Sequence, residues 1–563
     1  MAILAAVQLT VSAQLAVAQE NDPGERLLEE ERRRAQQENL ARNGAGQSIS
    51  IDAAKGPVEE AVCFPIKQIV IKGSTVLPAS SFAEVLAEFE EKCLGQVSIG
   101  HLLERLSGLY ANKGYITSRA YVPGQDVSSG QLVIEILEGR IEAIAYQQTQ
   151  GTKPSKPGKP RKIKSAFPQR SGDVFQLRDL EHGLEQMNRL RSSQANANLI
   201  AGAAPGTSQI VVTERKNDLV RGTVGFDNRG DEVTGRTQIR LNLEADDVLG
   251  INDTYSLSYS GSENSNAVAF GLSAPYRRWL FSASGSYSES LSPVTPTSDL
   301  FTQTANLNLR AERLLSRDDR TKSFGYISVS SYWNERFVNI AALTPQHRSS
   351  FRVGHRFEYR GLKSVIATNT SISFGSGLFG ADRDPVERLP GVPRTDFRKI
   401  ESNVTYIRPF DSGRQLSVVV VGQLANGALF SNEQLSIGGW ESVRGYSGFS
   451  SSGDSGAFVR SELSFRTISL DFSRFGKPLE NTNLWNPLQN AKGGFRPFLF
   501  ADAGYVTSRA TRSSASFFSA GVGFSTQVGA TSLNGTLAFP LRDDARREVD
   551  DFQAFVGLTI KIF

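Results

Sequence analysis

From about residue 219 onward, apolar and polar residues alternate with a period of two, which is the repeat of a β-strand. Arg236 to Asp246 and Thr304 to Glu312 follow this pattern throughout. About 16 such segments of ~10 residues follow one another with no helical interruption, as in outer-membrane barrels. A soluble β-sandwich also alternates but seldom has so many long segments in series. The pattern predicts a mainly β fold, with a transmembrane antiparallel β-barrel of about 16 strands over residues 218–563.

The region before the barrel changes to mixed helical and strand periodicity. Residues 63–142 have strand patterns at both ends and helical spacing at Phe82 to Phe89 and at Ile99 to Tyr110. Residues 143–217 repeat this order more loosely, with a helix at Leu177 to Leu190. Two α+β modules are therefore expected.

Between the two modules lies a basic, proline-rich run from Lys153 to Lys162. Repeated proline prevents ladder pairing and the like charges repel one another, so the run is predicted to be a loop. A solvated insertion is the simpler interpretation. Contact with acidic lipid or with an acidic client is the alternative.

The N-terminal segment, Met1 to Ala18, is apolar and ends in an A-x-A cleavage pattern. It predicts a signal peptide at 1–18, although it lacks the usual basic residue near Met1; a plain N-terminal helix is the alternative. Residues 19–43 have acids before bases, which favours a helix. That helix is either solvated or occupies a polar cavity elsewhere in the protein. Residues 44–62 contain a glycine-bounded linker.

The composition supports a barrel and excludes several other classes. Gly 51, Phe 33 and Tyr 14 suit short strands with aromatic girdles. The net charge of +4 shows no nucleic-acid-binding excess, and the mean hydropathy is only −0.27. Beyond the N-terminus no apolar run reaches the ~18 residues that a membrane helix needs.

The chain offers little for catalysis. Its four histidines form no zinc-binding motif, and it has no phosphate-binding loop and no nucleophile elbow. We expect no enzyme activity, cofactor or metal. The only two cysteines, Cys63 and Cys93, are expected to form a disulfide in an exported chain, with two unpaired thiols as the alternative.

Three stretches carry a family resemblance. Lys113 to Asp126, with Leu137 to Glu142 after it, resembles the first polypeptide-transport-associated (POTRA) domain of two-partner secretion transporters. Leu177 to Leu190 resembles their second POTRA domain. Val443 to Tyr446 is similar to the VRGY signature of the BamA/TpsB outer-membrane superfamily. The resemblance, to the TpsB family (ShlB/FhaC/HecB-like), covers essentially the whole mature chain.

The resemblance implies a function and a site. It implies an outer-membrane transporter, with POTRA domains in the periplasm, that secretes a large exoprotein of haemolysin or adhesin type without ATP. The transporter would be a monomer that contacts outer-membrane lipid, and the helix in 19–43 would be its plug. The functional loop would contain Val443, Arg444, Gly445 and Tyr446. By resemblance, Arg444 pairs inside the lumen with Asp502, whose strand neighbour Phe500 points the same way; a surface arginine is the alternative.

Two rival functions remain open. An insertase that assembles other barrel proteins would have more than two POTRA modules. A passive porin would have no use for the signature at Val443 to Tyr446 or for the repeated modules.

Overall fold

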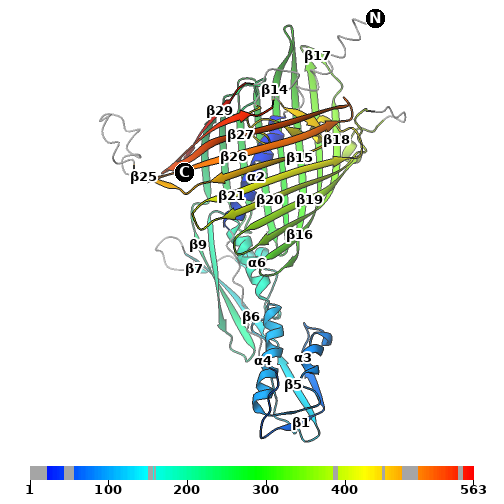
Figure 1. Cartoon of the computed structure of the whole chain (residues 1–563), viewed down its shortest axis with the longest axis vertical. Coiled ribbons are helices and arrows are strands. Elements are labelled where there is room, and N and C mark those ends of the chain that lie inside the picture. Colours follow the sequence, from blue (N-terminus) through cyan, green and yellow to red (C-terminus); the bar gives the residue numbers. More distant parts are fainter. Residues whose placement is uncertain are drawn as a thin grey trace.

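The computed structural model describes residues 22–42, 56–149, 156–157, 160–384, 391–446, 450–471, 492–542 and 550–563. The signal peptide predicted at 1–18 and most of the linker at 44–62 lie outside these residues. Two small α+β modules are stacked below a large barrel, and helix α2 (Pro23–Arg42) lies within the barrel (Figure 1).

The first module packs helix α4 against a small sheet. Leu102, Leu106 and Tyr110 recur every four residues, so they share one helix face, which packs against Leu132 and Ile134. Strands β2, β5 and β4 form the sheet in that order, and β1 pairs with β3 next to the Cys63–Cys93 disulfide. The elements are β1 (Phe64–Ile66), β2 (Gln68–Lys72), η1 (Ala79–Ser81), α3 (Ala83–Ala87), β3 (Lys92–Leu94), α4 (Gln96–Asn112), β4 (Arg119–Tyr121) and β5 (Gln131–Leu137).

The second module repeats this plan with a four-stranded sheet in the order β7-β6-β9-β8. Its core joins the helices to the sheet through Phe167, Phe175, Met187 and Val212. The elements are β6 (Arg140–Thr149), β7 (Lys156–Pro157), α5 (Pro160–Ala166), α6 (Leu177–Asn188), β8 (Ser193–Ala201) and β9 (Thr207–Lys216).

The prediction of a loop throughout Lys153 to Lys162 is wrong at two places. Lys156–Pro157 pairs with β6, because a two-residue edge strand tolerates proline. Pro160 begins α5, because proline is favoured in the first turn of a helix. The other residues of the run before Pro160 lie outside the described part of the chain.

Lys162 is also not solvated but fills the junction between the second module and the barrel. Its side chain is 2% exposed, and Nζ lies 2.6 Å from Glu214 Oε1 and 3.0 Å from Asp247 Oδ2. Asp247 belongs to the barrel turn after β11, and Lys216 reaches the same carboxylate at 3.1 Å. A buried ammonium is tolerated only when it is paired in this way.

The barrel closes because its last strand, β29, pairs antiparallel with its first, β10. Its 16 strands form one closed antiparallel sheet, which confirms the predicted fold class. β17 (Ala341–Ala342) and β25 (Ile468–Asp471) are short additions to it. The main strands are β10 (Val220–Asp227), β11 (Gln238–Asp246), β12 (Thr254–Gly261), β13 (Ser265–Tyr276), β14 (Trp279–Thr295), β15 (Ser298–Arg317), β16 (Thr321–Val338), β18 (Gln346–Arg360), β19 (Val365–Ser376), β20 (Arg398–Pro409), β21 (Gln415–Ala425), β24 (Ser455–Ser464), β26 (Lys492–Ser508), β27 (Ser513–Val528), β28 (Thr531–Pro540) and β29 (Gln553–Lys561).

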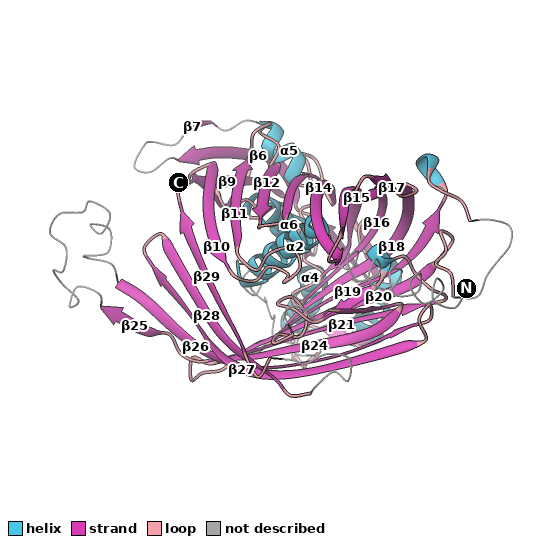
Figure 2. Cartoon of the chain, turned by 90° about the horizontal axis from the view of Figure 1, so that it is seen from above, coloured by secondary structure: helices cyan, strands magenta, loops and turns pink. Residues whose placement is uncertain are grey.

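The alternation in sequence becomes an apolar outer wall and a polar lumen. On β11, Ile239, Leu241 and Leu243 are exposed on the outside, whereas Arg240 points inward and contacts α2. On β15, Leu307 and Leu309 are outside. Viewed from above, α2 lies within the ring of strands (Figure 2). Among the described helices, none is long and apolar enough to cross a bilayer.

Helix α6 of the second module docks on the barrel turns through ion pairs. The carboxylate of Glu185 contacts Arg317 at 2.5 Å and Lys322 at 2.6 Å, from the two strands that flank one turn. Asp179 binds Arg278 at 2.7 Å, and Arg178 pairs with Asp319. We call the end of the barrel that carries these turns the module end.

The Glu185 cluster predicts a pH-dependent junction. Burial raises the pKa of Glu185, but the hydrogen bond and charge of Arg317 and the charge of Lys322 outweigh it and lower the pKa to about 2. The folded-state pKa of Glu185 thus lies below the unfolded value of about 4.3. The ionised carboxylate therefore stabilises the junction fully above about pH 4.3, and this stabilisation is lost as the pH falls toward 2.

We expect Glu185→Gln to weaken the docking of α6 by about 2 kcal/mol at pH 7, because it leaves two buried cations less well paired. Hydrogen exchange of the α6 amides should then be roughly 30-fold faster than in the wild type. The difference should shrink as the pH falls from 5 toward 2. Glu104→Gln, an exposed residue of α4, is the matched control. Equal exchange in the two variants would contradict the assignment.

Candidate functional site

The segment between β21 and β24 folds back into the lumen. Strands β22 (Leu435–Ile437) and β23 (Ser451–Gly453) form a hairpin base, and the chain between them carries the predicted signature Val443 to Tyr446. Gly438 and Gly439 both have positive φ, which lets the chain turn sharply after β22. We call residues 438–446 the lumenal loop.

Arg444 of the lumenal loop is joined to the barrel wall by a bidentate ion pair. Its Nε lies 2.7 Å from Oδ2 of Asp502, and its Nη2 lies 2.9 Å from Oδ1. The backbone N–H of Arg444 also donates to Oδ2, at 3.3 Å. Arg444 is 2% exposed and Asp502 is 3% exposed, so both charges are withdrawn from water. A planar guanidinium fork matches a carboxylate in this geometry, which lysine cannot reproduce.

Two further wall residues complete the arginine site. The guanidinium carbon of Arg444 lies 3.7 Å from the ring centroid of Phe500, a cation–π contact, and Nη1 lies 3.4 Å from Glu462. Glu462 on β24 stands directly opposite Phe500 on β26 in the strand register. The structure therefore brings together Arg444, Asp502 and Phe500.

The other signature residues also hold the lumenal loop against the barrel wall, by packing and by hydrogen bonds. The Val443 side chain packs against Gly504 of β26. A Cβ atom at position 504 would lie only 2.9 Å from the Val443 side chain, so this position needs glycine. The Tyr446 ring stacks on Phe517 at 4.4 Å, and its hydroxyl lies 2.8 Å and 2.9 Å from the carbonyl oxygens of Phe518 and Arg542. Gly445 has φ +96°, a conformation that favours glycine.

The lumenal loop also contacts helix α2. Arg33 Nη1 lies 2.9 Å from the Glu441 carboxylate and 2.7 Å from the Glu441 carbonyl oxygen. Arg460 of β24 donates to the same carbonyl at 3.2 Å. Next to it, the Trp440 ring packs at 5.1 Å from Phe555 of the last strand. The loop thus links α2 to strands β24 and β29 of the wall.

Polar contacts hold α2 to the rest of the wall. Glu30 pairs with Arg240, which also lies 3.0 Å from Asp227. Glu25 accepts from the Asn306 side chain at 3.1 Å. Among the described side chains of α2 the apolar contribution is small, because the buried cluster joins Leu27 and Leu28 to two alanines of β13.

The family resemblance implied the pairing of Arg444 with Asp502, but no sequence pattern indicated Glu441 or the pairing of Glu30 with Arg240. An i,i+4 helix pattern explains Glu29 and Arg33, whose side chains lie 3.2 Å apart, and gives no sign of long-range partners. Arg240 was recognisable only as an inward residue of an alternating strand. Within the described residues, no three His, Cys, Asp or Glu side chains are grouped to hold a metal ion.

Models of known families match most of the chain. The model described as "Haemolysin secretion/activation protein ShlB/FhaC/HecB" matches residues 206–526. A POTRA domain of ShlB type matches residues 64–139, and a second POTRA model matches 140–200.

Individual relatives agree with these models. The outer membrane transporter CdiB of Dickeya dadantii (strain 3937) is 29% identical over 479 residues, 82% of each chain. The hemolysin transporter protein ShlB of Serratia marcescens is 27% identical over 435 residues, 73% of this chain and 74% of that protein. The solved structure of CdiB from Escherichia coli has a TM-score of 0.82 and 26% identity, covering 98% of this chain and 99% of that one.

These matches confirm the predicted family and the location in the outer membrane, with the two α+β modules as POTRA domains in the periplasm. The family consists of transporters and not enzymes. The module end of the barrel is therefore its periplasmic end. The chain belongs to the ShlB/FhaC/HecB family of outer-membrane two-partner secretion transporters.

Proposed function

We propose that this protein secretes one large exoprotein, of haemolysin or adhesin type, through its own barrel and without ATP. The observation that carries the proposal is that the lumen holds two separate inserts, α2 and the lumenal loop, joined by the Arg33–Glu441 pair. A passive porin needs neither insert. Two POTRA domains, fewer than an assembly insertase has, favour secretion over insertion.

The contacts of α2 suit a plug that can leave. Its described contacts are mostly hydrogen bonds and ion pairs to a polar wall, such as Glu25 to Asn306 and Glu30 to Arg240. Water or a passing polypeptide can replace these polar partners on both α2 and the wall. A helix held by a buried apolar face would find no such replacement in water. We infer that α2 closes the lumen at rest and that the client displaces it.

The POTRA domains supply a binding surface for an extended client. β8 is the outer strand of the second sheet, and its Leu199 and Ile200 side chains are exposed. An unpaired strand edge binds an extended chain through backbone hydrogen bonds, with modest dependence on client sequence. Free energy for export would come from folding of the client outside, because the chain contains no nucleotide-binding motif.

The first prediction from the proposed function concerns Arg444. We expect Arg444→Ala, and also Arg444→Lys, to lower secretion of one large exoprotein at least tenfold, because the lost pair leaves the Asp502 carboxylate buried without its fork. Mass spectrometry of culture supernatants measures this at matched barrel levels. Arg414→Ala, in an exposed turn, is the control. A general fall in outer-membrane proteins would point to an insertase, and unchanged secretion would refute the proposal.

The second prediction concerns the plug. Glu441→Gln removes the charged partner that Arg33 has on the lumenal loop, so α2 should leave the lumen more often. Conductance in planar bilayers should then show more frequent channel openings than the wild type. The control is Glu263→Gln, in a turn at the opposite end of β12 from the modules. Openings as rare as in the wild type would mean that the pair does not retain α2.

The third prediction concerns client binding. Replacing Leu199 and Ile200 by serine should reduce secretion of the exoprotein identified with the Arg444 variants and leave bilayer conductance unchanged. Val97→Ser, an exposed apolar residue on α4 of the first POTRA domain, is the matched control. If secretion falls equally in both, the β8 edge is not the specific docking strand.

A further inference from the structure

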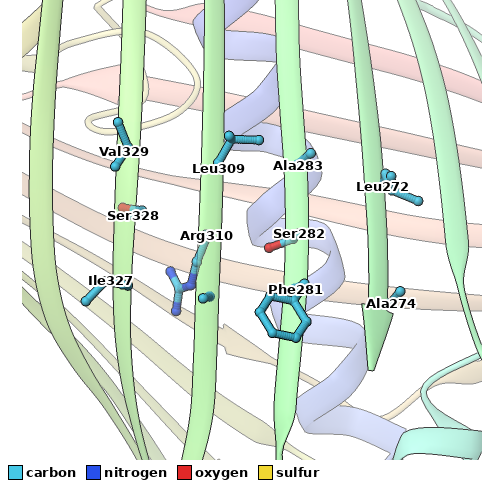
Figure 3. A pocket seen from close by; sticks show the side chains of 11 residues that line it. Leu272, Ala274, Phe281, Ser282, Ala283, Leu309, Arg310, Ile327, Ser328 and Val329 are labelled. Carbon is cyan, nitrogen blue, oxygen red and sulfur yellow. The ribbon is translucent and has the colours of Figure 1, made fainter. Parts of the chain in front are cut away.

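The outer wall of the barrel carries an apolar hollow near its periplasmic end. It has a volume of about 430 Å³ and is formed by strands β13 to β16 (Figure 3). Its outward side chains include Leu272, Phe281, Leu309 and Ile327, all of which are exposed. α2 lies on the other side of the same wall, so the hollow opens toward the membrane and not the lumen.

Strand register creates the hollow by alternating large and small side chains. One row across the four strands reads Ala274, Phe281, Ala311, Ile327, and the next reads Leu272, Ala283, Leu309, Val329. Ala311 and Ala283 therefore each stand between two larger neighbours in their rows, and Ala274 stands next to Phe281. The recess this leaves between ridges has the shape and chemistry to hold a hydrocarbon chain.

The row on the periplasmic side of the hollow is of a different kind. It reads Tyr276, Trp279, Arg313 and Gly325 across the same strands. The Arg313 guanidinium carbon lies 5.5 Å from the Trp279 ring centroid, and the Trp279 ring stacks on Phe281 at 5.9 Å. Tryptophan and tyrosine in this position occupy the headgroup level of a bilayer.

Arg313 is an exposed cation on the membrane side of the wall. Within the described parts of the chain it makes no ion pair, unlike its inward neighbours Arg310 and Glu312, which pair with each other. A guanidinium at headgroup level binds a phosphate well, since its planar fork donates to two oxygens. The turn residues that follow β13 contact the second POTRA domain, which sets this row on the periplasmic leaflet.

We propose that this hollow and Arg313 together bind one anionic phospholipid of the periplasmic leaflet. The phosphate lies at Arg313 and Trp279, and one acyl chain lies along the recess between Phe281 and Leu309. The site is separate from the lumen and does not rest on the proposed transport function.

Arg408 offers a matched comparison. It is an exposed residue near the periplasmic end of β20, and its guanidinium carbon lies 5.2 Å from the ring of Phe410. It shares the cation and the aromatic neighbour with Arg313, but it lies on β20, whereas Arg313 lies on β15, one of the strands that form the hollow. A lipid held by charge alone would bind equally at both places.

The test is native mass spectrometry of the full-length protein in detergent, with phosphatidylglycerol and phosphatidylethanolamine of identical chains at equal concentration. The wild type should retain one phosphatidylglycerol in preference. Arg313→Gln should reduce that preference about fivefold, while Arg408→Gln leaves it unchanged. Ala311→Leu, which fills the recess, should reduce retention of both lipids. Ala501→Leu, an exposed alanine on β26, should not.

Folding of each variant is checked by heat-modifiable migration on gels. The head-group preference of the wild type is a readout that needs no variant. Equal retention of the two lipids by the wild type would overturn the proposal. So would equal effects of Arg313→Gln and Arg408→Gln, or of the two leucine variants.

Discussion

The buried pair between Arg444 and Asp502 is the constraint around which the lumen is organised. Removing two charges from water costs several kcal/mol for each ion, so such a pair persists only when its geometry and hydrogen bonds are nearly complete. Here the fork is bidentate, the loop backbone adds a third donor, and the ring of Phe500 covers the guanidinium. A loop tied to the wall at this one place can then be tied elsewhere by weaker contacts, including the hydroxyl of Tyr446.

Paired charges also join the lumenal loop to α2, α2 to the barrel wall, and the second POTRA domain to the barrel. Glu441 of the lumenal loop pairs with Arg33 of α2, and Glu30 of α2 pairs with Arg240 of the wall. At the periplasmic end, two residues of the second POTRA domain form ion pairs with the barrel. Lys162 pairs with Asp247, and Glu185 pairs with Arg317. In each of these ion pairs, a residue of the barrel interior or of its periplasmic turns supplies the opposite charge. The second POTRA domain is therefore docked on the barrel by paired charges more than by apolar packing.

The sequence predicted the parts of this fold that depend on periodicity. Alternation along β11 and β15 identified the outward leucines, and four-residue spacing identified α4. The pairing of Arg444 came only from family resemblance, because the two residues are 58 positions apart and no local pattern joins them. Lys162 was misjudged for a related reason. A lysine in a basic run looks solvated unless the carboxylates of Glu214 and Asp247, far along the chain, are known to meet it.

The contrast between the two inserts suggests how a client could pass without unfolding the transporter. In the proposed cycle, α2 leaves by exchanging hydrogen bonds and ion pairs with water or client, since among its described side chains Leu27 and Leu28 form the apolar contact, with alanines of β13. The lumenal loop cannot leave so easily, because Val443 and Tyr446 are fully buried in an apolar cluster of the wall. Breaking that cluster would expose both apolar surface and an unpaired Asp502. The helix is thus the insert suited to move, and the loop is the insert suited to keep the wall of the open channel in shape.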